Sequence, residues 1–421
     1  STIPSMGKKR VVITGMGAIT PIGNNLIEYT SALKNGISGC KEIKSFDTTK
    51  FKTKFACEVK SYDPLDYFDR KESRKMDIFS QFGMIAAEEA IIHSEINLDK
   101  INKNSVGVIW GSGVGGIETF QNELINFAEN DKNPRFNPFF IPKLIPDICP
   151  GLIAIKYDFR GPNFATVSAC ASGSNAIIDA YNYILSDTSD IIITGGSESA
   201  VNETGVGGFN ALKALSERND SPETASRPFD RDRDGFVLGE GGGALILEEY
   251  NHAKNRDAKI YGEVIGFGMS CDAHHITAPH PEGEGARLVM ENALKSAQIQ
   301  IEEIDHINVH GTSTPLGDKS EIKAIENIFG SHAERINICS TKSMTGHLLG
   351  AAGAIESIAA LISINDSFIP PTINHFNYDE EINPKLNLTL NKYQSRDVNI
   401  AMSNTFGFGG HNTSLVFKKY N

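Results

Sequence analysis

Cys170 stands where a short β-type run gives way to a helix, a placement that suits a reactive thiol. Residues 164–167 before it are aromatic, small or β-branched, and apolar residues recur over 177–184 with the spacing of a helix buried on one face. The small residues of 168–173 allow a tight turn, and a helix N-terminus can lower a thiol pKa from about 8.5 into the range of roughly 3.5 to 7.5. The pattern predicts an activated nucleophile; the alternative is a buried, inert cysteine.

Two histidine motifs supply the basic or polarising partners that a nucleophilic cysteine needs. Residues 308–318 read NVHGTSTPLGD and contain His310, and residues 340–353 read STKSMTGHLLGAAG and contain Lys342 and His347. Either histidine taken alone is more often a structural residue than a catalytic one. Together with the cysteine, they favour one catalytic site.

Strand-turn-helix segments are expected to position these residues. Ile307 and Val309 indicate a strand that ends close to His310, before a loop punctuated by Gly and Pro. Residues 336–339 indicate a second strand, and residues 355–362 predict a helix with one apolar face. The segment around His347 therefore repeats the arrangement predicted around Cys170.

Motifs spread from residue 11 to residue 412 resemble those of the elongating β-ketoacyl-acyl carrier protein synthases, condensing enzymes of the thiolase superfamily. In order they are VVITGMG at 11–17, GSGVGG at 111–116, GPN at 161–163, SACASG at 168–173, RPFD at 227–230, RDGFV at 233–237, the two histidine motifs, and NTFGFGGHN at 404–412. The resemblance implies an α/β, thiolase-like, five-layered fold of two similar halves, residues 8–252 and 253–421, each with a mixed sheet. It also implies a homodimer that needs no cofactor and no metal ion.

The resemblance assigns the nucleophile and its gate. Cys170 would accept the growing acyl chain from a carrier-protein thioester and form a covalent acyl-enzyme. The backbone N–H groups of Cys170 and Phe408 would hold the oxyanion. Phe408 would also swing to gate the cysteine, with the glycines at 407, 409 and 410 permitting the motion.

The resemblance assigns the second half of the reaction to the histidine motifs. His310 and His347 would grip the malonyl thioester carbonyl and stabilise the enolate that remains when carbon dioxide departs. Lys342 would supply a nearby positive charge, with Glu356 as its counter-charge. Thr312 and Thr314 would support this region.

Further positions carry substrate and partner contacts in the resembling family. Val114 would line the acyl tunnel near the dimer interface. The positions that match carrier-protein docking sites are Lys71, Arg74, Lys75 and Lys213. For the basic run at 70–75 the alternative is a solvated helix face, which is the usual meaning of such a run.

The catalytic set discriminates between related activities. Chain-initiating condensing enzymes have a catalytic set of Cys, His and Asn, whereas this chain has Cys, His and His. Leu348 is more typical of the type II elongating synthases than of type I. The alternatives are a type I enzyme and a thiolase-like acyl-coenzyme A transferring enzyme, which would need a second cysteine that residues 404–412 lack. A non-catalytic partner subunit would lack the cysteine or a histidine.

Two other motifs resemble parts of known ligand sites. The GxGxxG pattern at 111–116 lacks the further features of a dinucleotide site and predicts a packing loop. The run DRDRDG at 230–235 resembles the start of a calcium loop, but Gly241 stands where the bidentate Glu belongs. The six cysteines show no zinc spacing, which favours a reduced compartment without structural disulfides.

Composition limits the partners and the compartment. The chain has 421 residues, 40% of them hydrophobic, and a net charge of −12, which disfavours nucleic acid as a partner. The family resemblance implies acyl carrier protein, in its acyl and malonyl forms, as the partner. No uninterrupted apolar run reaches the roughly 18 residues of a membrane span. In the resembling family threonine is usual at the position of His411, and a histidine there resembles plastid members. Together with a composition leaning to Lys, Asn and Ile, it predicts a plastid-type organelle (apicoplast or chloroplast stroma), with the bacterial cytoplasm as the alternative.

Overall fold

Strands and helices alternate along this computed structural model, which describes residues 9–421; residues 1–8, and with them the first residue of the predicted N-terminal half, lie outside the described part. The strands are β1 Val11–Ile19, β2 Lys41–Glu42, β3 Phe55–Ala56, β4 Val106–Gly111, β5 Asn163–Thr166, β6 Ile191–Glu198, β7 Gly241–Glu249, β8 Gly262–Cys271, β9 His306–Asn308, β10 Asn337–Cys339, β11 Phe368–Ile369, β12 Gln394–Ser395, β13 Ile400–Gly407 and β14 His411–Lys418. The α-helices are α1 Leu26–Asn35, α2 Arg70–Ser73, α3 Ile78–His93, α4 Ile117–Glu129, α5 Phe140–Leu144, α6 Ile148–Tyr157, α7 Ser172–Leu185, α8 Glu203–Ala211, α9 Tyr250–Asn255, α10 Glu284–Ala297, α11 Pro315–Phe329, α12 Lys342–Thr345 and α13 Ala352–Asp366.

The main sheet has ten strands and consists of two parts with the same internal order. The order is β10-β9-β13-β14-β8-β1-β7-β6-β4-β5. In each part the first strand of the chain (β1 or β8) pairs antiparallel with the last (β7 or β14), and the remaining strands follow in the same order and directions. A short antiparallel pairing of β1 with β8 joins the parts, so the two mixed sheets are continuous. Helix α9, which contains the predicted boundary at 252/253, separates β7 from β8.

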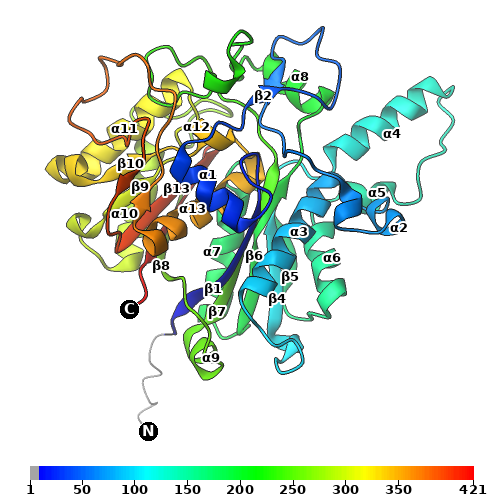
Figure 1. Ribbon diagram of the computed structural model, residues 1–421, viewed down its shortest axis with the longest axis horizontal. Coiled ribbons are helices and arrows are strands. Elements are labelled where there is room, and N and C mark those ends of the chain that lie inside the picture. The colour runs from blue at the N-terminus through cyan, green and yellow to red at the C-terminus, as the bar shows by residue number, and fades with distance from the viewer. Residues whose placement is uncertain (1–8) are drawn as a thin grey trace.

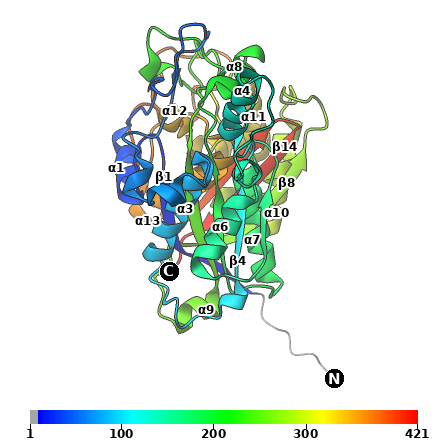
Figure 2. The same ribbon diagram turned by 90° about the vertical axis from the view of Figure 1, so that its right-hand side faces the viewer.

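Helices form three layers around the two parts of the sheet (Figure 1). Helices α3 and α6 cover the outer face of the β1–β7 part, and α10, backed by α11, covers the outer face of the β8–β14 part. Helices α7 and α13 contact strands of both parts and each other, so they form the middle layer. Figure 2 views the molecule from the side of α3 and α6, which lie in front of the sheet. The arrangement confirms the predicted layered α/β fold.

Helix α13 is buried on all sides, although the sequence predicted one buried face. Nearly all of its residues are inaccessible, because the helix lies between the two parts of the sheet and has no solvent side. The stretch Leu349–Asp366 is long and apolar enough to cross a membrane, but 89% of it is buried inside the protein. It is the core helix of this fold.

The glycine-rich loop after β4 packs against the turn that carries Cys170. A Cβ atom on Gly111 would lie 2.4 Å from the backbone carbonyl of Ser172, and one on Gly113 would lie 2.7 Å from a carboxylate oxygen of Glu198. The loop donates its N–H groups to the protein's own Glu198 carboxylate. This contact agrees with the predicted packing loop.

The middle layer should carry much of the stability. Ile355 is fully buried in α13, where it contacts Gly243 of β7. We expect Ile355→Ala to lower the free energy of unfolding by about 2 to 5 kcal/mol because it leaves a cavity between two sheets. Urea unfolding measures the change, and Ile27→Ala, at a residue that is 82% exposed, is the control. Equal effects of the two substitutions would contradict this account of the core.

Candidate active site

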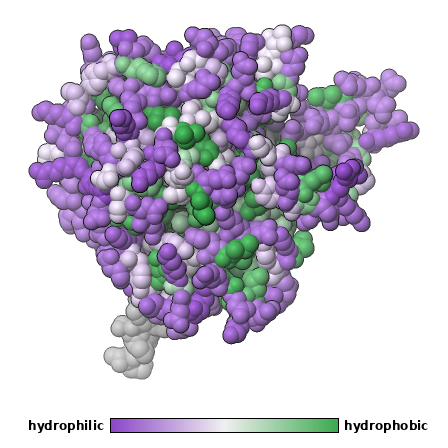
Figure 3. Space-filling model, viewed as in Figure 1, coloured by the Kyte–Doolittle hydropathy of each residue, from purple (hydrophilic) through white to green (hydrophobic). Residues whose placement is uncertain are grey.

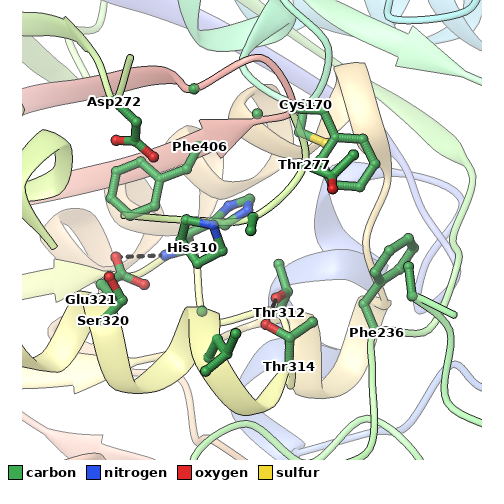
Figure 4. A pocket seen from close by; sticks show the side chains of 18 of the residues that line it. Cys170, Phe236, Asp272, Thr277, His310, Thr312, Thr314, Ser320, Glu321 and Phe406 are labelled. Carbon is green, nitrogen blue, oxygen red and sulfur yellow. Dashed lines mark hydrogen bonds between the residues drawn. The ribbon is translucent and has the colours of Figure 1, made fainter. Parts of the chain in front are cut away.

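One cavity of about 520 Å³ brings the central predicted residues together. The predicted residues that line it are Cys170, Lys213, His310, Thr312, Thr314, His347 and Phe408. They come from both halves of the chain. Figure 4 shows the thiol of Cys170 and the imidazole of His310 beside the same space, with Thr312 and Thr314 on its wall.

The turn that carries Cys170 joins the end of β5 to the start of α7 and is fixed by Ser172. The backbone N–H of Ser168 donates to Ser172 Oγ at 3.0 Å, and Ser172 Oγ donates to the carbonyl of Ala169 at 2.6 Å. Ala169 has a left-handed φ of 51°, which a non-glycine residue adopts only at some cost. The tight turn therefore places Cys170 just before the N-terminal end of α7, as predicted from the small neighbouring residues.

The Cys170 thiol is held neutral, contrary to the prediction from the sequence. Burial raises the pKa of this thiol to about 12, while the Lys342 charge and the backbone N–H groups of Phe408 and Cys170 itself act in the opposite direction. The prediction of a lowered thiol pKa is wrong, because removal from water outweighs the helix N-terminus. The backbone N–H groups of Phe408 and Cys170 both lie against the sulfur as hydrogen-bond donors.

The Phe408 loop approaches the cysteine turn closely enough to require glycine. A Cβ atom on Gly407 would lie 2.8 Å from the carbonyl oxygen of Ser168 and 3.1 Å from the backbone nitrogen of Cys170. Gly409 and Gly410 have φ values of 91° and 83°, which other residues rarely adopt. The backbone N–H groups of Cys170 and Phe408 thus lie together and can stabilise an oxyanion formed at the thiol.

His310 presents one defined nitrogen to the cavity. It follows β9, and its backbone N–H and that of Gly311 donate to the Glu321 carboxylate at 3.0 and 2.9 Å. The Lys342 ammonium, which can only donate, lies 3.3 Å from Nδ1. Nδ1 therefore accepts, and the proton resides on Nε2. Burial, then Lys342 and His347, hold the pKa of His310 well below its usual value, so the ring is neutral.

His347 has the same tautomer by a different contact. The backbone N–H of Leu349 donates to His347 Nδ1 at 3.2 Å, which leaves the proton on Nε2. Burial and the Lys342 charge hold its pKa well below the usual value. The His310 and His347 rings are perpendicular, with centroids 5.3 Å apart. Two neutral imidazoles thus offer N–H donors to one cavity, an arrangement suited to an oxygen that gains negative charge.

A buried ion pair lies behind His310. Lys342 Nζ is 2.9 Å from Oε1 and 2.8 Å from Oε2 of Glu356, and both side chains are fully buried. Burial raises the pKa of Glu356 to about 7, against the lowering effect of Lys342. The pair keeps a positive charge beside the histidines while neither residue lines the cavity.

The remaining predicted residues lie elsewhere. Val114 does not line this cavity; it is 40% exposed, and its N–H donates to Glu198. Lys71, Arg74 and Lys75 are exposed on and just after α2, away from the cavity, where Lys75 lies over the ring of Phe139. Lys213 alone among the predicted docking residues stands at the cavity.

Sequence reasoning missed two kinds of supporting residue. Glu321, which orients the His310 backbone, lies in α11 one turn after Asp318, and both are buried beside apolar neighbours. The available signal was the spacing of Asp318 and Glu321 with the apolar residues Ile322 and Ile325, which places acidic side chains on the apolar face of a helix. Phe406, whose ring centroid is 5.4 Å from that of His310, lies inside the NTFGFGGHN motif, where no local signal distinguishes it from Phe408.

The run DRDRDG at 230–235, which resembles the start of a calcium loop, binds the backbone of its own segment and of residues 376–377. Asp230 accepts from the backbone N–H groups of Asp232, Phe376 and Asn377 at 2.6 to 2.8 Å. Within residues 9–421 no group of three or more His, Cys, Asp or Glu side chains is arranged to hold a metal ion. All six cysteines are free thiols.

Family models match most of the chain. The model described as "Beta-ketoacyl synthase, N-terminal domain" matches residues 8–253, and "Beta-ketoacyl synthase, C-terminal domain" matches residues 261–376. The "3-oxoacyl-[acyl-carrier-protein] synthase 2" of Synechocystis is 46% identical over 99% of this chain and 99% of its own length. The protein of the same name from Staphylococcus aureus is 46% identical over 98% of this chain and 99% of its own length.

Solved ketosynthase structures share the fold. "The ishigamide ketosynthase/chain length factor" has a TM-score of 0.92 and 32% identity over 99% of this chain and 100% of that chain. A type II PKS acyl-carrier protein in complex with its ketosynthase bound to the hexaketide has a TM-score of 0.90 and 30% identity over 98% of this chain and 100% of that chain. These similarities confirm the predicted thiolase-like fold class.

The neutral histidines predict a specific pH dependence. Because the folded-state pKa values of His310 and His347 lie well below about 6.5, the native protein binds fewer protons than the unfolded chain below that pH. Their contribution to stability is therefore lost as the pH falls below about 6.5. We expect the ring NMR signals of both residues to show no titration between about pH 8 and 5.5. An inflection near 6.5 at either ring would contradict the neutral assignment.

Proposed function

The chain belongs to the beta-ketoacyl synthase family, and from this premise we propose that it condenses malonyl-acyl carrier protein with a cysteine-bound acyl chain in type II fatty acid elongation, the reaction of a 3-oxoacyl-[acyl carrier protein] synthase 2. The observation that carries the proposal is the meeting of Cys170 with two neutral histidines at one cavity, with Lys342 behind them. The near full-length relatives of that name support the same reaction.

The first half of the reaction transfers the acyl chain to Cys170. The sulfur attacks the carbonyl carbon of the carrier thioester, and the tetrahedral oxyanion accepts hydrogen bonds from the backbone N–H groups of Cys170 and Phe408. The carrier thiol then leaves with the proton of the Cys170 thiol. Because burial raises the pKa of the Cys170 thiol to about 12, we propose that its proton is lost only as the thioester engages. Phe408 lies beside the cysteine on a glycine-rich loop, and its side chain would have to move aside for the acyl chain to reach Cys170.

The second half forms the new carbon–carbon bond. The Nε2–H groups of His310 and His347 would donate to the malonyl thioester oxygen; the carboxylate leaves as carbon dioxide, and the electron pair of the broken bond forms the enolate. The enolate carbon attacks the acyl carbonyl, and Cys170 departs as thiolate, which regains a proton from water. Lys342, 3.3 Å from His310 Nδ1, fixes the donor tautomer that this step needs. We propose that Thr312 and Thr314, whose hydroxyls lie 3.1 Å apart, bind the part of the carrier protein's prosthetic group that carries the thioester into the cavity.

A thiolase-like transfer of acyl groups from coenzyme A is the less supported alternative. Such an enzyme uses a second cysteine as a base at the site. Cys170 is the only one of the six cysteines that lines the cavity. Two histidine donors instead suit a reaction that releases carbon dioxide and leaves an enolate.

Acyl carrier protein, in acyl and malonyl forms, is the proposed partner. The solved complex of a related ketosynthase with its acyl-carrier protein supports such an encounter. Lys213 stands exposed at the cavity, where it can meet an acidic carrier. Lys71, Arg74 and Lys75 form a second exposed basic group, which we propose as a further docking position. Val114 remains a proposed tunnel residue, with its side chain outside the described cavity.

We propose that two copies of the chain associate through the β5 end of the sheet. Strand β5 pairs with β4 on one side only, and Val167 just after it is 62% exposed. Free strand edges favour pairing with another chain. The neighbouring arm formed by α4 and α5 projects from the body and carries exposed apolar residues (Figure 3). They are Phe120, Leu124, Ile125, Phe136, Phe139 and Ile141.

We propose the bacterial cytoplasm as the location of the protein. The relatives from Synechocystis and Staphylococcus aureus, both bacteria, support this proposal. The plastid-type organelle predicted from His411 and composition gains no support from them.

The two half-reactions should separate by mutation. We expect Cys170→Ala to lose the acyl adduct formed with acyl-carrier protein but to retain carbon dioxide release from malonyl-carrier protein. His310→Ala and His347→Ala should retain the adduct and slow carbon dioxide release by about 10²- to 10³-fold, because each removes one oxyanion donor. Intact-protein mass spectrometry and gas release measure the two steps.

A histidine away from the cavity provides the control. His332 Nε2–H donates to the carbonyl of Ile304 at 2.9 Å and does not line the cavity, so His332→Ala should leave both half-reactions unchanged. If the three active-site variants lost both half-reactions alike, the assigned roles would be wrong.

The association should respond to a charge at the free edge. We expect the wild-type chain to sediment at twice the mass of one chain and Val167→Lys to shift it toward the monomer, because a lysine at the end of an edge strand opposes pairing. Ile27→Lys, on the exposed face of α1, is the matched control. A wild-type monomer at micromolar concentration would contradict the proposed dimer.

A further inference from the structure

Glu198, at the end of β6, is a fully buried carboxylate that the reaction described above does not use. Its oxygens accept from the backbone N–H groups of Gly113, Val114 (3.2 Å) and Gly350 (3.1 Å) and from the hydroxyl of Ser112 (3.2 Å). Among the ion pairs of residues 9–421 it has no cationic partner. Neutral donors alone therefore hold this carboxylate, and burial raises the pKa of Glu198 to about 7 against the lowering effect of those donors.

One group of these donors belongs to the segment that supports the nucleophile. A Cβ atom on Gly113 would lie 3.3 Å from the carbonyl oxygen of Ala169, the residue before Cys170. Gly111, just before Ser112, packs on the backbone of Ser172, the residue whose hydroxyl fixes the cysteine turn. Glu198 thus anchors the surface on which the turn rests.

The remaining donor belongs to the segment that orients His347. Gly350 follows Leu349, whose backbone N–H donates to His347 Nδ1 and fixes its tautomer. The carbonyl oxygen of Gly350 also packs against Gly173 and Gly196, where a Cβ atom would lie 2.7 and 2.5 Å from it. The two catalytic turns therefore meet at Glu198.

Both turns contain strained backbone beside this anchor. Ala169 and Leu349 have left-handed φ values of 51° and 52°. Non-glycine residues keep such conformations only where the surrounding structure holds them. Glu198 bonds directly to the residue after Leu349 and to the segment packed on Ala169, so it is placed to hold both.

We propose that Glu198 is a positioning residue that locks the Cys170 turn to the His347 turn, so that the acyl-cysteine and the enolate meet at reacting distance. This role rests on the condensation proposed above. The carboxylate also acts on the nucleophile through its charge: it raises the pKa of the Cys170 thiol, whereas the Lys342 charge lowers it.

Two substitutions separate the anchor from the charge. Glu198→Ala removes every acceptor and should lower kcat for condensation by about 10- to 100-fold, since displacements of about 1 Å cost this much. Each half-reaction measured alone should fall less, and KM for the carrier substrates should stay unchanged because Glu198 lies outside the cavity. Glu198→Gln keeps one oxygen for the backbone donors and removes the charge. It should fold, retain most of kcat and shift the pH profile of Cys170 alkylation to lower pH.

Glu89 offers a matched control. This half-buried carboxylate in α3 likewise accepts from backbone N–H groups, those of Ala18 and Leu26, but neither donor belongs to the Cys170 turn or the His347 turn. We expect Glu89→Gln to leave kcat and the alkylation profile of Cys170 unchanged. Iodoacetamide labelling followed by mass spectrometry gives the profile without any carrier substrate.

The outcomes distinguish the inference from the proposed function. If wild type condenses and both Glu198 variants keep its kcat per folded molecule and its alkylation profile, the positioning role is overturned. If Glu198→Ala does not fold, Glu198→Asp, whose shorter side chain withdraws the carboxylate from its donors, takes its place, and a wild-type kcat in that variant overturns the positioning role. If wild type fails to condense carrier substrates, the proposed function falls, whatever the variants do.

Discussion

The contact between Lys342 and His310 is the interaction on which the rest of the site depends. A buried ammonium 3.3 Å from Nδ1 compels that nitrogen to accept and leaves the proton on Nε2, where the cavity can use it. It also opposes protonation of both histidines. Burying a single cation would be costly, and Glu356 offsets that cost through two short contacts. The fold therefore has to enclose α12 and α13 together.

The duplicated sheet explains how distant segments converge. Strand β5 in the first part occupies the same place in the order as β10 in the second. The turn that bears Cys170 follows β5 and leads into α7, and the turn that bears His347 follows β10 and leads into α13. Because α7 and α13 pack against each other in the middle layer, equivalent turns of the two parts open onto one cavity. A repeated topology thus produces a site whose two halves perform different steps.

The sequence was most informative where chemistry and local structure coincide. The turn at Cys170 and the strand ends before His310 and Lys342 were predictable because small residues, β-branched runs and helical spacing are local signals. The thiol pKa was predicted in the wrong direction, since the sulfur is buried among residues far away in sequence, such as Val206, Phe236 and Leu349. The all-round burial of α13 likewise depends on a second part of the sheet, which periodicity within one helix does not reveal.

The most direct test of the central claim is the product of a complete turnover. The enzyme would be mixed with an acyl-carrier protein and malonyl-carrier protein labelled with carbon-13 at the two carbons retained after decarboxylation, and carrier-bound products read by mass spectrometry. The account predicts a 3-oxoacyl-carrier protein longer by one labelled two-carbon unit, with release of the unlabelled carboxyl carbon as carbon dioxide. Extension from acyl-coenzyme A donors alone, or acyl transfer without loss of that carbon, would contradict it.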